Sequence, residues 1–106
     1  AMRDANRSAL NRVELGMSKS QVIAVMGEKA ASGMNGTVEN PYRREMMKGL
    51  DGGTYEILYY YTEQIGEKPV ETGLTPIVLN NGKVTGIGWG YLDSLSGNST
   101  TTIRRR

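Results

Sequence analysis

Cysteine and histidine are both absent from this 106-residue chain. Without them the protein has no thiolate nucleophile, no imidazole for acid–base catalysis, no disulfide and no thiolate or imidazole ligand for zinc or haem. The acidic residues show no spacing that requires a carboxylate pair or a metal site. We therefore expect no cofactor and no metal, and most common enzyme mechanisms are excluded.

The chain also lacks a strongly basic face. It carries 13 basic residues, and three of them are the terminal Arg104, Arg105 and Arg106, which leaves 10 to set against 11 acidic residues in the rest of the chain. A nucleic-acid-binding protein needs clustered basic residues to displace the counterions around the phosphates. We expect no nucleic-acid partner.

No apolar run approaches the roughly 20 residues that a membrane-spanning helix needs, and no signal peptide is recognisable. Ala1 and Met2 look like a cloning remnant, so residues 1–3 are predicted to be a remnant or a flexible start. Glycine contributes 14 residues, about twice its usual share. These features indicate a single globular domain that is rich in turns.

The strongest local signal is the start of a short helix at Ser18. The Ser18 side chain can accept a hydrogen bond from the Gln21 backbone amide while Gln21 reaches back to the Ser18 amide, which is a capping box. Met17 and Val22 are placed to pack on each other as a hydrophobic staple. Gly27 can adopt the left-handed conformation that ends a helix. The sequence therefore predicts a helix of about two turns between Ser18 and Gly27.

An earlier helix is predicted over residues 4–14, with Asp4 as its cap, because Ala9, Leu10 and Val13 recur at helical spacing. Downstream, β-branched and aromatic residues alternate between turn signals. We predict a loop over 28–41, strands over 42–47, 55–62, 74–79 and 84–91, and a flexible polar and basic tail over 93–106. That order predicts an α+β domain over residues 4–92, with two short N-terminal helices packed on an antiparallel three- or four-stranded meander sheet.

Alternation along the strands divides the aromatic residues between two faces of the sheet. Tyr59 shares one face with Ile57, and Tyr60 takes the other. In the last strand, Trp89 and Tyr91 would lie opposite a glycine face that leaves room for a neighbouring ring or helix. Two short helices cannot cover both faces, so Trp89 or Tyr60 should be partly exposed.

An exposed aromatic patch on a sheet is a plausible protein contact. The candidate partner-contact residues are Tyr42, Arg43, Tyr60, Trp89 and Tyr91. Two structural alternatives stay open: the rings cover glycine gaps in the sheet, and Tyr42 and Arg43 belong to a solvated edge strand.

The chain resembles the SmpA/OmlA family of small outer-membrane lipoproteins, also called BamE-like. The resemblance covers about Leu10 to Leu92 and is most specific at the helix start. The segments that carry it are Leu15-Gly16-Met17-Ser18-Lys19-Ser20-Gln21-Val22, Met26-Gly27, Glu56-Ile57-Leu58-Tyr59-Tyr60-Tyr61, Leu74-Thr75-Pro76-Ile77-Val78-Leu79, Asn81-Gly82-Lys83-Val84 and Gly86-Ile87-Gly88-Trp89-Gly90. The stretch Asn40 to Glu45 is closer to an uncharacterised lipoprotein branch of the family.

The resemblance implies a non-enzymatic domain that binds protein partners in the bacterial cell envelope and supports outer-membrane assembly or integrity. It implies a periplasmic location, with attachment to the outer membrane only through a lipid on an N-terminal cysteine that this chain does not contain. The same two-layer form resembles one half of the β-lactamase inhibitor proteins, which leaves an inhibitor-like or small-ligand-binding module as the alternative. A hydrolase or ligand receptor would instead need a concave pocket with converging arginine and glutamate side chains.

Overall fold

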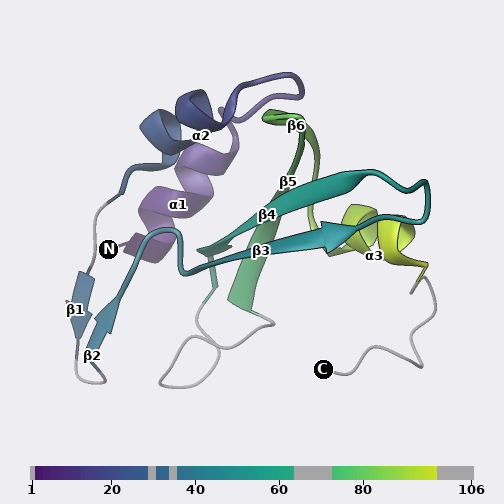
Figure 1. Ribbon diagram of the computed structural model, residues 1–106. Coiled ribbons are helices and arrows are strands. Elements are labelled where there is room, and N and C mark those ends of the chain that lie inside the picture. The colour runs from purple at the N-terminus through teal and green to yellow at the C-terminus, as the bar shows by residue number, and fades with distance from the viewer. Residues whose placement is uncertain (1, 29–30, 34–35, 64–72, 98–106) are drawn as a thin grey trace.

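The computed structural model describes residues 2–28, 31–33, 36–63 and 73–97, which place helices on both faces of a four-stranded antiparallel sheet (Figure 1). The elements follow one another as α1 (Met2–Leu10), α2 (Lys19–Met26), β1 (Ala31–Gly33), β2 (Gly36–Val38), β3 (Arg43–Lys48), β4 (Thr54–Tyr61), β5 (Leu74–Asn80), β6 (Lys83–Ile87) and α3 (Trp89–Ser96).

The main sheet has the strand order β3-β4-β5-β6, and each neighbouring pair is antiparallel. The predicted α+β fold, with two N-terminal helices on a meander sheet, is therefore confirmed. The predicted loop over 28–41 is wrong in part, because Ala31 pairs with Val38 and Gly33 with Gly36 in a separate two-stranded sheet. Each of these strands has only three residues, which is too short for side-chain alternation to be visible in the sequence.

Helix α2 begins as the capping box predicts. The Gln21 amide donates to the Ser18 hydroxyl at 3.2 Å, and the Ser18 amide donates to the Gln21 side-chain oxygen at 2.8 Å. The helix ends at Met26 and is followed by its C-cap, Gly27, whose amide donates to the Ile23 carbonyl at 2.7 Å. The φ of Gly27, 85°, favours glycine, but its ψ of 161° lies outside the left-handed helical conformation predicted there. Met17 and Val22 both pack in the same hydrophobic cluster.

Helix α1 is displaced toward the N-terminus from its predicted position. It begins at Met2 and ends at Leu10, so Asp4 lies inside its first turn and does not cap it. Met2 and Arg3 are helical, which differs from the flexible start that was one of the two expectations for these residues, and residue 1 lies outside the described residues. After Leu10 the chain tightens into turns with hydrogen bonds between residues three apart, and Val13 still reaches the core from there.

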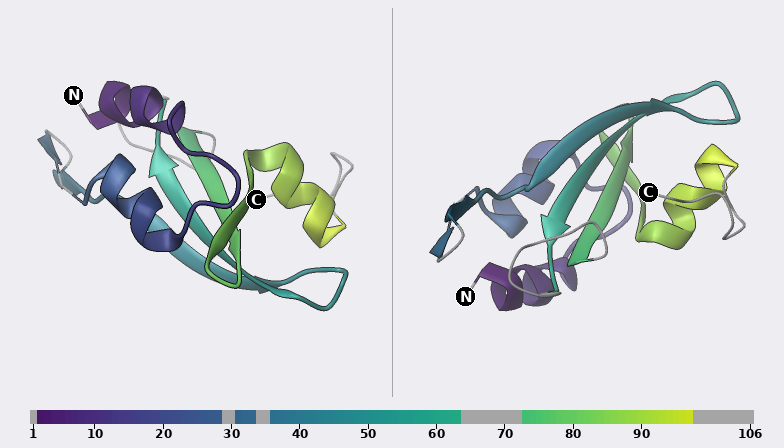
Figure 2. Two further views of the ribbon diagram at one scale, coloured as in Figure 1. Left: turned by 90° about the horizontal axis from the view of Figure 1, so that it is seen from above. Right: turned by 90° about the horizontal axis from the view of Figure 1, so that it is seen from below.

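Two hydrophobic clusters lie on opposite faces of the sheet. One lies between the sheet and α1 and α2, and the other between the sheet and α3 (Figure 2). Strand β4 contributes to both, because Leu58 and Tyr60 belong to the first cluster while Ile57 and Tyr59 belong to the second. The alternation predicted for this strand is confirmed, and the strand is buried on both sides.

The C-terminal helix corrects the prediction of a strand over 84–91. Strand β6 ends at Ile87, and Gly88, with φ of 99°, turns the chain into α3. Trp89, Leu92 and Leu95 then recur at three-residue intervals and pack against the sheet. Helix α3 also replaces the first part of the predicted tail, while residues 98–106 lie outside the described residues.

The ring of Tyr91, on helix α3, lies over Gly86 of strand β6. A Cβ atom added to Gly86 would overlap the ring of Tyr91. The expectation that a glycine in this segment makes room for a ring is therefore confirmed at Gly86. At its other end the helix is tied to the β3–β4 hairpin, since the Leu50 amide donates to the Leu95 carbonyl at 2.9 Å.

The two edges of the main sheet differ. The connection between α1 and α2 runs along β6, where the Gly16 amide donates to the Val84 carbonyl and the Val84 amide donates to the Met17 carbonyl, both at 2.8 Å. The Lys19 amide donates to the Gly82 carbonyl at 3.0 Å, and Ser18 forms a bridge with Lys83. Strand β3 forms the opposite edge of the sheet.

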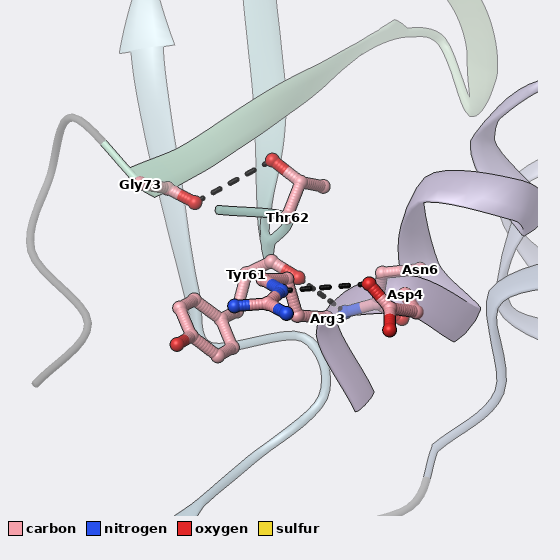
Figure 3. A network of polar contacts seen from close by, with 6 residues as sticks. All are labelled: Arg3, Asp4, Asn6, Tyr61, Thr62 and Gly73. Carbon is pink, nitrogen blue, oxygen red and sulfur yellow. Dashed lines mark hydrogen bonds and ion pairs between the residues drawn. The ribbon is translucent and has the colours of Figure 1, made fainter. Parts of the chain in front are cut away.

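A polar contact inside the fold joins α1 to the end of β4 (Figure 3). The Asn6 side-chain amide donates to the Tyr61 carbonyl at 2.8 Å. Next to it, the Thr62 hydroxyl reaches the Gly73 carbonyl at 3.4 Å and the Thr75 hydroxyl at 2.7 Å. These bonds fix the point where β4 ends and β5 begins.

Candidate functional site

Tyr59 packs against an arginine and a tryptophan on the sheet face that carries α3. The Arg43 guanidinium carbon is 4.5 Å from the Tyr59 ring centroid. The Trp89 and Tyr59 ring centroids are 5.5 Å apart, with the planes inclined by 35°. Strands β3 and β4 and helix α3 thus bring together side chains that are 46 positions apart in the sequence. We call Arg43, Glu45, Tyr59 and Trp89 the Tyr59 cluster.

Polar bonds hold each member of the Tyr59 cluster. The Tyr59 hydroxyl donates to a Glu45 carboxylate oxygen at 2.8 Å, and the other Glu45 oxygen lies 3.5 Å from the Arg43 Nε. The Trp89 indole N–H donates to the Leu74 carbonyl at 2.8 Å. Burial, together with the bond to Glu45, raises the pKa of Tyr59, so its phenol keeps its proton further into the alkaline range than a free tyrosine does.

The accessible part of the cluster is its arginine, glutamate and tryptophan. Tyr59 itself is buried, Arg43 and Trp89 are half-buried, and Glu45 is exposed. A rigid aromatic support that presents an arginine and a tryptophan is the composition that dominates binding energy at protein interfaces. Since Glu45 is already bonded to Tyr59 and ion-paired with Arg43, we assign these polar groups to holding the patch in shape.

Two of the predicted contact residues meet in this cluster, Arg43 and Trp89. Tyr42 is adjacent, exposed at 39%, and its amide donates to the Tyr59 carbonyl at 2.8 Å. Tyr91 is half-buried on α3, where its ring covers Gly86. These positions leave Tyr42 beside the cluster and give Tyr91 a packing role.

Tyr60 corrects the prediction. Its side chain is 0% exposed and packs in the cluster under α1 and α2, on the face opposite Arg43 and Trp89. The physical reason is the alternation of β4 itself, which turns Tyr60 toward the two helices while Tyr59 faces α3. Tyr60 therefore does not belong to an exposed contact surface, and partial exposure holds for Trp89 alone.

Tyr59 and Glu45 are the members that sequence reasoning missed. Their recognition depends on the register of β3 and β4, in which Arg43 stands opposite Tyr59 and Glu45 opposite Ile57. The sequence placed Tyr59 on the correct face but gave no register for its neighbour. Pairing outward from the Asp51-Gly52-Gly53 turn would have brought Arg43 onto Tyr59.

The described part of the chain contains no group of three or more acidic side chains that could hold a metal ion. Among those residues there is also no helix long and apolar enough to span a bilayer.

In comparisons with known proteins, a family model described as "Protein of unknown function (DUF3192)" matches residues 1–94. No curated protein and no solved structure matches the chain.

Proposed function

The chain belongs to the DUF3192 family. We propose that it is a non-enzymatic cell-envelope domain that binds protein partners and supports outer-membrane assembly or integrity. The proposal includes a periplasmic location, with a lipid anchor on the full-length protein as its attachment to the outer membrane. The segments that resemble the SmpA/OmlA lipoproteins support the location, and the Tyr59 cluster supports the binding function.

The observation that carries the proposal is the packing of both Arg43 and Trp89 against Tyr59. Both side chains are half-buried, so part of their conformational entropy is already lost before a partner arrives. Arginine and tryptophan are also the side chains that most often act as binding hot spots. A surface of this kind fits a protein partner.

A photocrosslinking experiment in intact cells tests the binding function. A photoreactive amino acid replaces Tyr42, next to the Tyr59 cluster, in the full-length protein expressed in its native bacterium. The matched control replaces Leu15, which is exposed on the connection between α1 and α2. We expect a discrete crosslinked envelope protein, identified by mass spectrometry, from position 42 and a different pattern or none from position 15.

Substitutions test whether the crosslink from position 42 depends on the Tyr59 cluster. Arg43→Ala removes the side chain stacked on Tyr59, and we expect it to reduce the crosslink severalfold. Arg12→Ala removes an exposed arginine after α1 and should leave the crosslink unchanged. A crosslink that forms equally from positions 42 and 15, or that Arg43→Ala leaves intact, would refute the proposed contact. Intact-mass analysis of the membrane-extracted protein tests the proposed lipid anchor. A mass without acyl chains would refute it.

A further inference from the structure

Strand β3 is an edge strand that pairs on one side only. Its six residues pair with β4, and in the described part of the chain no segment is recorded along its other side. The opposite edge of the sheet is occupied, because the chain from Gly16 to Lys19 hydrogen-bonds along β6. Within the described residues, the main sheet therefore offers one free row of backbone hydrogen-bonding groups, along β3.

The hairpin fixes which backbone groups form that row. The Gly49 amide donates to the Gly53 carbonyl at 2.8 Å, which makes this a hydrogen-bonded pair. Antiparallel pairs alternate between hydrogen-bonded and non-hydrogen-bonded, so the next pair, Lys48 with Thr54, is non-hydrogen-bonded. It follows that the N–H and C=O groups of Lys48, Met46 and Arg44 point away from β4.

The side chains of the same three residues share one face and are all exposed. They form the sequence basic, apolar, basic, and Met46 at the centre is 65% exposed. Among the described residues, three of the four exposed large hydrophobic side chains lie in or beside this strand, namely Tyr42, Met46 and Leu50. A solvated edge does not need an apolar side chain between its two charges.

We propose that the free edge of β3 binds an extended segment of a protein partner as an added strand, in which acidic residues flank an apolar residue at alternate positions. The inference rests on the proposed protein-binding function and specifies the mode of binding and the chemistry of the partner. The backbone groups of Arg44, Met46 and Lys48 supply the hydrogen bonds. Their side chains supply the selectivity, with each acidic residue opposite a basic one and the apolar residue on Met46.

The charges favour an acidic partner over a second copy of this chain. If two copies paired antiparallel about Met46, Arg44 of one copy would face Lys48 of the other at both ends of the contact. Like charges directly opposite each other destabilise a strand pair, whereas glutamate or aspartate in the same places would stabilise it. The edge therefore disfavours self-association and selects an acidic segment.

A peptide titration followed by NMR tests this inference. The probe is a seven-residue peptide that alternates threonine with glutamate, valine and glutamate. The comparison peptide carries lysine in place of both glutamates. We expect saturable shifts at the amides of Arg44, Met46 and Lys48 in the low millimolar range with the glutamate peptide, and weaker binding by at least about fivefold with the lysine peptide.

Charge reversal in the protein gives the reciprocal test. The double variant Arg44→Glu with Lys48→Glu should bind the glutamate peptide at least about fivefold more weakly than the wild-type protein does. It should bind the lysine peptide more tightly than the glutamate peptide. The matched control is Arg7→Glu with Arg12→Glu, which makes the same charge change at exposed positions in and just after α1. It should leave both affinities within about twofold. Circular dichroism confirms that both variants are folded.

A proline tests the backbone contribution separately. Met46→Pro removes an N–H that points away from β4, so the ladder to β4 remains while one bond to the added strand is lost. We expect at least about a tenfold loss of affinity, and Met46→Ala should lose less. If Met46→Pro fails to fold, the charge-reversal pair still decides the question.

Equal binding of the two peptides, or shifts confined to residues outside β3, would overturn the inference. Concentration-dependent self-association through β3 would overturn it as well. The outcomes are separate from those of the proposed function. If the peptide does not bind but the crosslink from position 42 persists, only the strand-addition hypothesis is refuted. If the peptide binds but no envelope protein is crosslinked, the proposed function is refuted.

Discussion

The side-chain amides of Asn6 and Asn40 hydrogen-bond to each other in both directions. Asn6 donates to Asn40 at 2.9 Å, and Asn40 donates to Asn6 at 3.1 Å. Both residues are buried, and each also donates to a backbone carbonyl, Asn6 to Tyr61 and Asn40 to Met26. One amide pair therefore joins α1, the end of α2, the end of β4 and the segment before β3.

We predict that Asn40→Ala lowers the free energy of unfolding by roughly 2–4 kcal/mol, because it leaves buried groups of Asn6 and Met26 without a partner. Urea denaturation followed by circular dichroism measures the change. The exposed Asn11→Ala serves as the control and should change stability by no more than about 0.5 kcal/mol. The double variant Asn6→Ala with Asn40→Ala should cost less than the sum of the two single variants, and additive costs would show that the pair does not act as a unit.

Alkaline stability provides a second prediction, at Tyr60. Burial raises the pKa of Tyr60 from 10.0 to about 12, and its hydroxyl has no hydrogen-bond partner among the described residues. Above pH 10 the unfolded chain therefore releases a proton that the folded chain still holds. The contribution of Tyr60 to stability is complete below pH 10 and is lost as the pH rises toward 12.

The variant Tyr60→Phe should flatten this loss of stability between pH 10 and 12, as measured by denaturation at a series of pH values. At neutral pH it should be neutral or stabilising by up to about 1 kcal/mol, because it removes a buried hydroxyl that makes no bond. Tyr42→Phe, at an exposed ring, is the matched control. A large loss of stability in Tyr60→Phe at neutral pH would mean that the hydroxyl has a partner.

A third prediction concerns the glycine under the Tyr91 ring. Gly86→Ala should destabilise the protein by about 1–3 kcal/mol, since the added methyl group overlaps that ring. In a chain that already carries Tyr91→Ala, adding Gly86→Ala should cost less stability than it costs in the wild-type chain, because the ring is no longer there to overlap. Gly90→Ala is the control, because its Cβ would meet nothing within 4 Å. Thermal denaturation measures all four proteins, and an unchanged midpoint for Gly86→Ala would contradict the packing.

The parts of the fold that the sequence predicts are those fixed by neighbouring residues. The Ser18–Gln21 capping box and the turn at Asn81, whose φ is 54°, depend on contacts within four positions. The start of α3 does not depend on such local contacts. Gly86, Gly88 and Trp89 fit a strand period as well as a helix start, and the preference for a helix comes from Leu92 and Leu95 packing on the sheet.

The candidate site shows the same division. Partial exposure of Trp89 or Tyr60 was predicted and holds for Trp89, and Tyr42 was expected at a contact surface or a solvated edge. The contact between Arg43 and Tyr59 required the strand register. The burial of Asn6 was equally inaccessible, because its partner lies 34 positions away. Long-range pairing determines these features, and no local pattern encodes it.

The stretch from Gly16 to Lys19 also affects how the protein can self-associate. Open-ended stacking of sheets into fibrils demands that every unit both offer and accept a strand. Here the chain's own backbone already covers the β6 edge, which leaves the β3 edge to pair with another strand. Any row of such domains would stop after its first junction, so the strand addition proposed at β3 does not lead to polymerisation.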